Sequence, residues 1–495
     1  MRSIEYHPAG PVAERFHKSD AFVRGLMGPV GSSKSSACWM ELLDRAMRQK
    51  PNSQGVRRTR AAILRNTYPE LKSTTIKTCL EWSPMMQMRW DSPITGNLDI
   101  WLPDKTRLQM EVHFLALERP EEVDKLGSLE LTFGWINEVR EVAKAIFDKL
   151  TERVGRFPPV REGGPTWRGV VLDTNPPDDD SWYYKLAEKA DPELVNQTLQ
   201  VEAKLRSMGF LKEGEPLIEF FKQPGGLIEV NGQYEPNPAA ENIPNLDGGH
   251  AYYFRQIAGK RKQWIKAQIL GQYATVANGK PVYPEYNDDI HCKEVHPNPI
   301  LPLILGWDFG LNGMAVVIGQ LNKLGQLIVL DELTPTRMEG LDEFAETVVK
   351  PHLAQNYPKY EIRSVGDPSG AYGSTNEAKT AFQILANCGF VLMPALSNDP
   401  MARIESVRKF LTGMVSGQPR FLIDHKASKT RKGLAGRYMF ERVQVSNKEI
   451  YKDKPVKDEY SHSADALGYL ALHVTHVDLN SWSKGKIKYP NAGIV

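Results

Sequence analysis

The stretch GPVGSSKSS at residues 28–36 constrains the fold most, because it joins two segments of opposite character. The short apolar run AFVRGLM precedes it, and ACWMELLDRAM, whose apolar residues have helical spacing, follows it. At such a strand-to-helix junction, backbone N–H groups of a glycine-bearing turn and of the helix N-terminus can hold phosphate oxygens. The stretch therefore predicts a mostly parallel α/β domain with a phosphate-binding loop.

The loop matches the pattern G-x-x-x-x-G-K-[ST] except at Ser33, which replaces the second fixed glycine. Lys34 would reach the β- and γ-phosphates and Ser35 would ligate Mg²⁺. A serine adds only a Cβ and a hydroxyl, so we expect it to be tolerated with a non-positive φ. An ordinary turn with an N-capping serine is the alternative. The predicted nucleotide-binding residues of the loop are Gly28, Gly31, Ser32, Ser33, Lys34 and Ser35.

The run LTFGWINEV indicates a second part of the same site, since it ends in the polar pair Asn137 and Glu138. Glu138 would polarise the water that attacks the γ-phosphate. Asn137 takes the position where an aspartate usually supports the metal; its amide can hydrogen-bond a metal-bound water but contributes no charge. A solvated residue at a strand end is the alternative interpretation of Glu138.

Three further positions suit a nucleotide site. Arg65, after the run AAILRN, could sense phosphate, and it could equally be a surface charge. Arg153 and Arg156 in LTERVGRFP are candidates for an arginine finger, acting in the same chain or from a neighbouring subunit. Thr174 and Asn175 end the run VVLDTN and would couple hydrolysis to motion by detecting the γ-phosphate.

The length and composition indicate several soluble domains. The chain has 495 residues, more than one compact domain holds, with 62 basic against 60 acidic residues and a net charge of +2. Any contact with nucleic acid must then come from local basic clusters, such as KRKQWIK at 260–266, RIESVRK at 403–409 and KASKTRK at 426–432. Solvated helix faces are the alternative for each cluster. Scattered cysteines, and no apolar span or signal peptide, lead us to expect a cytoplasmic protein.

The rhythm of the sequence changes twice. A phosphate-loop domain is expected over 1–223, followed by a Gly-, Pro- and Asn-rich connecting region over 224–298. From 299 to 478 the order of apolar runs and helical patterns is β-β-β-α-β-α-β-α, beginning with a three-strand antiparallel meander. That order is typical of a ribonuclease H-like domain with a mixed sheet. A C-terminal tail is expected over 479–495.

Three aspartates fall where this second topology would gather them. Asp308 lies in the apolar run LILGWDFG, where an unpartnered carboxylate would be costly to bury. Asp367 ends the fourth strand, and Asp465 falls in the first turn of a last helix that we expect to begin near Ser461. Clustered carboxylates persist when metal ions neutralise them, so we predict a site for two Mg²⁺ or Mn²⁺ ions. Asp331, Asp458 and His462 are satellite candidates.

Together these motifs resemble the large terminase subunit of tailed bacteriophages, over nearly the whole chain. The resemblance rests on GPVGSSKS, LRNTYPELKST, GWINEV, RVGRFP, VVLDTNPP, GWDFG, VGDPSG and YSHSADALGYL. It implies an N-terminal P-loop ATPase joined to a ribonuclease H-like nuclease. ATP hydrolysis, with Mg²⁺, would drive double-stranded DNA into a procapsid, and two-metal chemistry would cut concatemeric DNA.

The resemblance also implies partners and a location. The partners would be double-stranded DNA, the portal protein and the small terminase subunit, with a homo-pentamer as the working state. The protein would act in the host cytoplasm, bound transiently to the procapsid and not retained in the mature virion. Two other functions remain open at this point. One is a nuclease-helicase of repair or restriction type, which would unwind DNA, and the other is a non-enzymatic capsid- or portal-associated binding protein.

Overall fold

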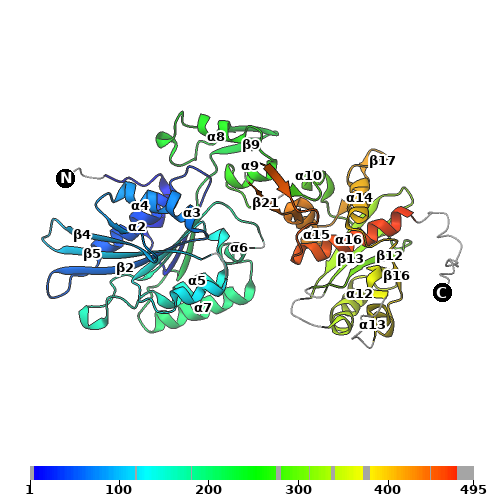
Figure 1. Cartoon of the computed structure of the whole chain (residues 1–495), viewed down its shortest axis with the longest axis horizontal. Coiled ribbons are helices and arrows are strands. Elements are labelled where there is room, and N and C mark those ends of the chain that lie inside the picture. The colour runs from blue at the N-terminus through cyan, green and yellow to red at the C-terminus, as the bar shows by residue number, and fades with distance from the viewer. Residues whose placement is uncertain are drawn as a thin grey trace. The chain divides into compact units, whose positions relative to one another are not determined.

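The computed structural model describes residues 5–117, 120–179, 181–274, 280–310, 313–335, 340–371, 379–445 and 448–476. The chain divides into two compact units, 1–276 and 277–495 (Figure 1). The segment 224–276, expected to connect two domains, lies within the first unit, and 277–298 lies within the second. The predicted tail at 479–495 is outside the described residues.

The first unit is built on an eight-stranded sheet in the order β3-β4-β5-β2-β6-β7-β1-β8. The strands from β5 to β8 in this order are parallel, and β3 and β4 add an antiparallel edge. The four apolar runs expected to form strands lie in β1, β2, β6 and β7, which confirms the predicted α/β class. The strands are β1 Val23–Met27, β2 Val56–Arg65, β3 Gln87–Arg89, β4 Ile94–Trp101, β5 Arg107–Ala116, β6 Phe133–Asn137, β7 Gly169–Thr174 and β8 Ile218–Lys222.

Helices cover both faces of this sheet, as Figure 1 shows for α2 and α4 on one side and α5 and α7 on the other. The alternation of side chains along buried strands explains this: Trp135 packs with α2, and its neighbour Ile136 packs with α5. The helical elements are α1 Pro11–Lys18, α2 Lys34–Arg48, α3 Tyr68–Glu70, η1 Leu71–Thr75, α4 Ile76–Trp82, η2 Pro120–Leu126, η3 Val139–Glu141, α5 Lys144–Arg153, η4 Val160–Glu162, α6 Trp182–Ala187 and α7 Pro192–Ser207.

The rest of the first unit packs on the predicted phosphate loop. The amide of Val30 donates to the carbonyl of Gln268 (2.8 Å), and the Asn242 side chain donates to the carbonyl of Gly31 (2.7 Å). Val30 also packs against the small apolar cluster around Tyr253. These contacts tie the Gly- and Pro-rich region to the loop. Its elements are β9 Leu227–Val230, β10 Gln233–Pro236, η5 Ile243–Asn245, α8 Ala251–Ile257 and α9 Lys262–Gln268.

The second unit is built on a six-stranded mixed sheet in the order β16-β15-β12-β13-β14-β19. The strands β12, β13 and β14 form the predicted antiparallel meander, and β15 runs parallel to β12. This topology confirms the ribonuclease H-like order. The strands are β12 Leu303–Asp308, β13 Ala315–Leu321, β14 Leu327–Leu333, β15 Ile362–Gly366, β16 Leu392–Pro394 and β19 Phe421–Ile423; shorter pairs are β11 Lys280–Pro281 with β20 Met439–Phe440, β17 Met414–Val415 with β18 Gln418–Pro419, and β21 Arg442–Val445 with β22 Lys448–Tyr451.

The long last helix, α16 Glu459–His476, crosses the middle of this sheet. Gly306 on β12 makes the approach possible, because a Cβ there would lie 2.3 Å from the carbonyl oxygen of Ala466. The close packing brings one face of α16 over the end of β12. The other helical elements are α10 Asp288–His291, α11 Leu341–Phe344, η6 Ala345–Val349, α12 Lys350–Asn356, η7 Pro368–Ala371, α13 Ala381–Asn387, α14 Pro400–Leu411, α15 Ser428–Lys432 and η8 Gly433–Arg437.

Candidate functional site

The predicted nucleotide residues meet at the carboxyl edge of the first sheet. The strand β7 lies between β1 and β6, so the ends of these three parallel strands are neighbours. Asp173 on β7 is in register with Leu26 on β1 and with Asn137 on β6. Ligands of open α/β sheets bind outside the carboxyl ends of the strands, and the loop between β1 and α2 lies at this edge.

The loop itself departs from the sequence expectation at Ser33. Its φ is 65°, in the left-handed region that favours glycine, so the expected non-positive φ was wrong. Its side chain makes no capping hydrogen bond to α2, which removes the support for an ordinary N-capped turn. Gly31, with a φ of 72°, meets the same demand without strain. The backbone therefore keeps the left-handed step of a phosphate loop although the glycine is missing.

Lys34 is buried in the loop that precedes it. Its Nζ donates to the carbonyl of Pro29 (2.7 Å) and lies 3.4 Å from the Ser32 hydroxyl. Within the described residues no carboxylate oxygen lies within 4 Å of Nζ. Burial lowers the pKa of Lys34, while the charges of Glu138 and Asp173 oppose that shift. A buried ammonium that bonds only neutral oxygens is suited to receive an anion.

A buried glutamine holds the loop in place through side-chain hydrogen bonds. The Gln223 side chain donates to the Ser32 carbonyl (3.0 Å) and to Glu241 (2.9 Å), and it accepts from the Ser32 hydroxyl (2.8 Å). A Cβ at Gly28 would lie 2.5 Å from the Gln223 side-chain oxygen, so glycine is needed there. Sequence reasoning missed Gln223, because it follows β8 almost 200 residues after the loop.

A polar cluster joins the three strand ends. The Asn137 amide nitrogen donates to both carboxylate oxygens of Asp173 (2.9 and 3.0 Å) and contacts the Ser35 hydroxyl (3.1 Å). The Ser35 hydroxyl donates to Asp173 Oδ2 (3.0 Å), and the Trp135 indole donates to Oδ1 (2.7 Å). Burial and the charge of Glu138 raise the pKa of Asp173, and the donors from Asn137 and Trp135 oppose the shift. Asp173 was not among the predicted site residues.

Glu138 and Arg65 border this cluster. Glu138 has a φ of 51°, and its Oε2 is buried, accepts no hydrogen bond, and lies 3.4 Å from Arg140 Nε. Such backbone strain is characteristic of functional positions. Arg65 donates to the Asn137 side-chain oxygen (2.7 Å) and lies 3.5 Å from Glu70. Arg140, a position that sequence reasoning missed, therefore lies closer to Glu138 than any predicted arginine finger.

Thr174 and Asn175 lie beside the start of the loop. The Gly28 amide donates to the Thr174 carbonyl (3.2 Å), and the Asn175 side chain donates to the Gly28 carbonyl (2.9 Å). Both residues are buried. These contacts place both residues beside the loop, where the Thr174 hydroxyl donates to the Asn175 carbonyl (2.7 Å).

Arg153 and Arg156 do not join the site within one chain. The amide of Leu131, which precedes β6, donates to the Arg153 carbonyl (3.1 Å), and the amide of Arg156 donates to the Leu131 carbonyl (2.9 Å). Both arginines are thus beside the amino end of β6, about 20 Å along the strand from Asn137. This placement is not compatible with an arginine finger that acts in the same chain.

The residues at this edge fit a nucleotide with Mg²⁺. The strongest observation is the buried Lys34 ammonium, which bonds neutral oxygens beside a loop of backbone N–H groups. Magnesium in proteins prefers a hydroxyl, one or two carboxylates and substrate phosphates. Ser35 and Asp173 supply the first two kinds of oxygen.

The carboxylate site of the second unit gathers its residues at the end of β12. Trp307 and Gly366 are in register, and the Asp367 amide donates to the Trp307 carbonyl (3.3 Å), so Asp308 and Asp367 follow neighbouring strand ends. His462 Nδ1 on α16 lies 2.7 Å from Asp308 Oδ2. Burial and the charge of Asp465 raise the pKa of Asp308, and the His462 hydrogen bond opposes the shift.

Asp465 is neutralised by side chains of its own unit. Arg403 (3.2 Å) and the Tyr438 hydroxyl (3.0 Å) donate to its Oδ1, and Lys457 forms an ion pair with its Oδ2. The helix begins at Glu459 rather than near Ser461, so Asp465 is in the second turn and not the first. Arg403, which belongs to the predicted basic cluster 403–409, is buried against Asp465 and is not available to DNA.

This arrangement does not fit the predicted two-ion site. Among the described residues, no group of three or more His, Cys, Asp or Glu side chains is arranged to hold a metal ion. Of the three satellite candidates, His462 contacts Asp308 at the site and the other two are engaged elsewhere. Asp331 accepts from His352 (2.8 Å), and Asp458 accepts from the amides of Tyr460 (2.9 Å) and Ser461 (3.0 Å) at the start of α16. Asp308 and Asp367 have suitable oxygen ligands, but Asp465 has both oxygens occupied.

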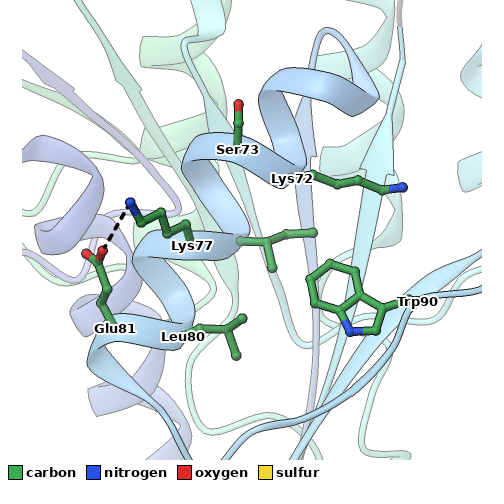
Figure 2. A pocket seen from close by; sticks show the side chains of 7 residues that line it. Lys72, Ser73, Lys77, Leu80, Glu81 and Trp90 are labelled. Atoms are coloured by element: carbon green, nitrogen blue, oxygen red, sulfur yellow. Dashed lines mark ion pairs between the residues drawn. The ribbon is translucent and has the colours of Figure 1, made fainter.

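A shallow hollow of about 440 Å³ lies on the outer side of η1 and α4 in the first unit and shares no lining residue with the nucleotide site (Figure 2). Within it Lys77 pairs with Glu81 at 4.0 Å on the exposed surface. It is lined by Lys72, Ser73, Ile76, Lys77, Leu80, Glu81 and Trp90. The opposite side of the same η1 turn contacts the nucleotide site, because the Thr75 hydroxyl donates to Asn137 (2.7 Å).

Two general expectations can be compared with the described part of the chain. No described helix is both long and apolar enough to cross a membrane. The four cysteines, Cys38, Cys79, Cys292 and Cys388, are free thiols. Burial raises the pKa of the Cys38 and Cys79 thiols, which makes them poor nucleophiles.

Comparisons with known proteins find similarity in solved structures only. The sequence matches no protein-family model and no curated protein. A large terminase from a thermophilic bacteriophage is 15% identical, with a TM-score of 0.35, over 94% of this chain and 96% of its own. The bacteriophage HK97 large terminase is 12% identical, with a TM-score of 0.34, over 94% of this chain and 95% of its own.

The ATPase domain of a Thermus phage large terminase is similar to part of the chain. It is 14% identical, with a TM-score of 0.31, and covers 54% of this chain and 95% of its own length.

Proposed function

We propose that this protein is an ATP-driven motor that moves double-stranded DNA during viral genome packaging and also cleaves DNA. The motor resides in the first unit and the cleavage in the second. The sequence motifs of a large terminase support this proposal together with the geometry at the carboxyl edge of the first sheet. ATP with Mg²⁺ is its proposed cofactor.

The assembly of the nucleotide site carries the proposal. Lys34, Ser35 and Glu138 come from two segments about 100 residues apart and lie around one strand-edge cluster. Lys34 is buried without a carboxylate in contact, and Glu138 keeps a buried oxygen that accepts no hydrogen bond. The Lys34 ammonium is the stronger of these two observations, since a buried charge is costly unless a ligand uses it. Glu138 Oε2 is already paired with Arg140 (3.4 Å).

The roles follow from these positions. Lys34 and the loop amides would bind the β- and γ-phosphates, with Ser35 and Asp173 facing the metal ion. Bound Mg²⁺ would neutralise charge that develops on the phosphates. Glu138 would orient the attacking water, and Asn175 would transmit the state of the loop to β7 through its bond to Gly28.

DNA cleavage is assigned to Asp308 and Asp367, with Asp465 as the third carboxylate. Because Arg403 and Lys457 neutralise Asp465 in this conformation, its participation requires that Lys457 leave Oδ2. The exposed position of Lys457, 63% accessible, makes such a movement inexpensive. Mg²⁺ or Mn²⁺ is proposed for cleavage only in a conformation in which Lys457 has left Asp465, because the described arrangement does not hold two ions.

The proposed partners are double-stranded DNA, the portal protein and a small terminase subunit, in the host cytoplasm on a procapsid. A homo-pentameric ring is proposed as the working state. The position of Arg153 and Arg156 at the far edge of β6 is compatible with an arginine finger only from a neighbouring subunit. The basic cluster 260–266 is proposed to contact DNA phosphates.

Two reciprocal substitutions test the proposal. Lys34→Ala should reduce ATP hydrolysis at least about 100-fold and leave Mn²⁺-dependent nicking of plasmid DNA unchanged. Asp308→Ala should abolish nicking and leave ATP hydrolysis unchanged. Lys77→Ala, which removes an exposed lysine from the same unit, is the control and should alter neither activity.

The proposal fails if neither substitution changes any activity. A nuclease-helicase would be indicated instead if the wild-type protein separates the strands of a duplex in an ATP-dependent displacement assay. A packaging motor moves duplex DNA without separating its strands.

A further inference from the structure

In the polar cluster at the strand ends, the carboxylate expected at position 137 on β6 is found instead at position 173 on β7. The strand β6 ends in Asn137, where a metal-supporting aspartate would be expected, and the neighbouring strand β7 carries Asp173 in register with it. Residues in register on adjacent parallel strands point to the same face of the sheet, so the two side chains are direct neighbours. The carboxylate missing from β6 is therefore present one strand away.

The hydrogen bonds fix the orientation of Asn137. Its side-chain oxygen accepts from Arg65 (2.7 Å) and from Thr75 (2.7 Å), so its NH₂ group faces Asp173 and Ser35. An NH₂ group repels a cation and cannot be its ligand. Asn137 is therefore unsuited to hold a metal ion, whichever ion binds.

Asp173 has the opposite character. It is fully buried, and all of its observed donors are neutral: the Trp135 indole, the Asn137 amide and the Ser35 hydroxyl. Among the described residues, therefore, no contacting cation cancels its negative charge. It bonds the hydroxyl that follows the loop lysine, which is the group expected to ligate Mg²⁺.

We infer that Asp173 is the positioning carboxylate for the Mg²⁺ of the nucleotide, and that Asn137 is a neutral donor that holds Asp173 in place. This inference rests on the proposed ATPase function. It adds a residue from β7 to the site and explains why an asparagine is compatible with a metal-dependent site. An aspartate at both positions would place two carboxylates in contact, which is unfavourable.

The test compares Asp173→Asn with the exchange variant N137D/D173N, by equilibrium binding of a fluorescent ADP with and without Mg²⁺. Asp173→Asn should lose at least about 10-fold of the Mg²⁺-dependent gain in affinity and leave Mg²⁺-free binding unchanged. The exchange variant, which restores one carboxylate to the pair but places it in contact with Arg65, should regain part of that gain. A purely structural role of Asp173 would weaken both kinds of binding equally.

Several outcomes would overturn the inference. One is an Asp173→Asn variant in which Mg²⁺ increases the affinity for ADP as much as in the wild type. Another is an exchange variant that folds but in which Mg²⁺ does not increase the affinity for ADP. If wild-type protein binds no ADP under either condition, the proposed ATPase function fails instead. Lys34→Ala should lose ADP binding with and without Mg²⁺, and it serves as the reference for a protein without a nucleotide site.

A measurement on the wild-type chain covers variants that do not fold. Fe²⁺ replaces Mg²⁺ with ADP, and ascorbate with peroxide then cleaves the backbone beside the bound iron. Cuts should appear near residues 35 and 173 and should require ADP. Absence of a cut near 173, with a cut near 35, would contradict the assigned role.

Discussion

Asp173 in the first unit and Asp465 in the second are both buried at a candidate site, and they differ in their partners. Asp173 in the first unit is held by neutral donors, whereas Asp465 in the second unit contacts the cations Arg403 and Lys457. Both are at most 3% exposed. Neutral donors orient a carboxylate and leave its charge for a ligand, while cations cancel that charge. The first site is thus arranged to bind a cation, whereas the second can bind a metal ion only after a side-chain cation leaves Asp465.

The largest expected effect comes from removing the buried cation that contacts Asp465 in the second unit. Arg403→Ala leaves Asp465 buried with only Tyr438 and the exposed Lys457 as partners, which should destabilise the unit by about 3–5 kcal/mol. Urea unfolding gives the free energy, and hydrogen exchange of α16 locates the change. The control is Lys409→Ala, an exposed residue on the same helix. A loss below about 1 kcal/mol would show that Arg403 does not neutralise Asp465.

The next prediction concerns a carboxylate of the first unit that is paired as Asp465 is. Glu41 on α2 is fully buried and contacts His17 (2.6 Å), Arg24 (2.7 Å) and Arg45 (2.7 Å). Burial by itself would raise the pKa of Glu41, but the His17 hydrogen bond and the arginine charges outweigh it and lower the pKa to about 2.

A lowered pKa in the folded state means that ionised Glu41 stabilises the fold above its unfolded pKa, near 4.5, and that this contribution is lost as the pH falls toward 2. Glu41→Gln should therefore cost about 3 kcal/mol at pH 7, and the difference from wild type should shrink below pH 4.5. Denaturant unfolding at a series of pH values measures both. Glu14→Gln, at an exposed pair, is the control. A pH-independent difference would refute the linkage.

A smaller effect is expected at the exposed cation of the second site. Lys457→Ala should change the free energy of unfolding by less than about 1 kcal/mol, because Lys457 is largely in solvent. It should nevertheless tighten Mn²⁺ binding up to about 10-fold, since Asp465 Oδ2 becomes available. Calorimetric titration measures the affinity, with Lys452→Ala, at an exposed pair, as control. Weaker Mn²⁺ binding by the Lys457 variant would contradict the view that Lys457 blocks the metal site by pairing with Asp465.

The smallest effect is expected in the phosphate loop. Glycine at position 33 relieves a left-handed backbone but adds freedom to the unfolded chain, so Ser33→Gly should lie within about 1 kcal/mol of wild type. Ser33→Ala keeps the Cβ and should be less stable than Ser33→Gly. Thermal unfolding compares the two. An alanine variant as stable as the glycine variant would show that the left-handed φ carries no strain.

The sequence by itself determined much of this protein. The apolar runs predicted the strands β1, β2, β6 and β7 and the antiparallel meander of the second unit. They could do so because the spacing of apolar residues that marks a buried strand is visible within a short segment of sequence. It also located Lys34, Ser35 and Glu138 in the first unit and the three aspartates in the second. Most of these residues lie at strand or helix ends, where local pattern and topology coincide, whereas Asp465 lies in the second turn of α16.

The tertiary structure decided which charges meet. The strand order β6-β7-β1 differs from the chain order, and only that order brings Asp173 against Asn137 and Ser35. The sequence likewise could not show that Arg403 and Lys457 contact Asp465, or that Arg153 lies beside the amino end of β6. A residue's chemistry can be read from sequence, but whether its charge is cancelled depends on neighbours from distant segments that only the folded chain brings together.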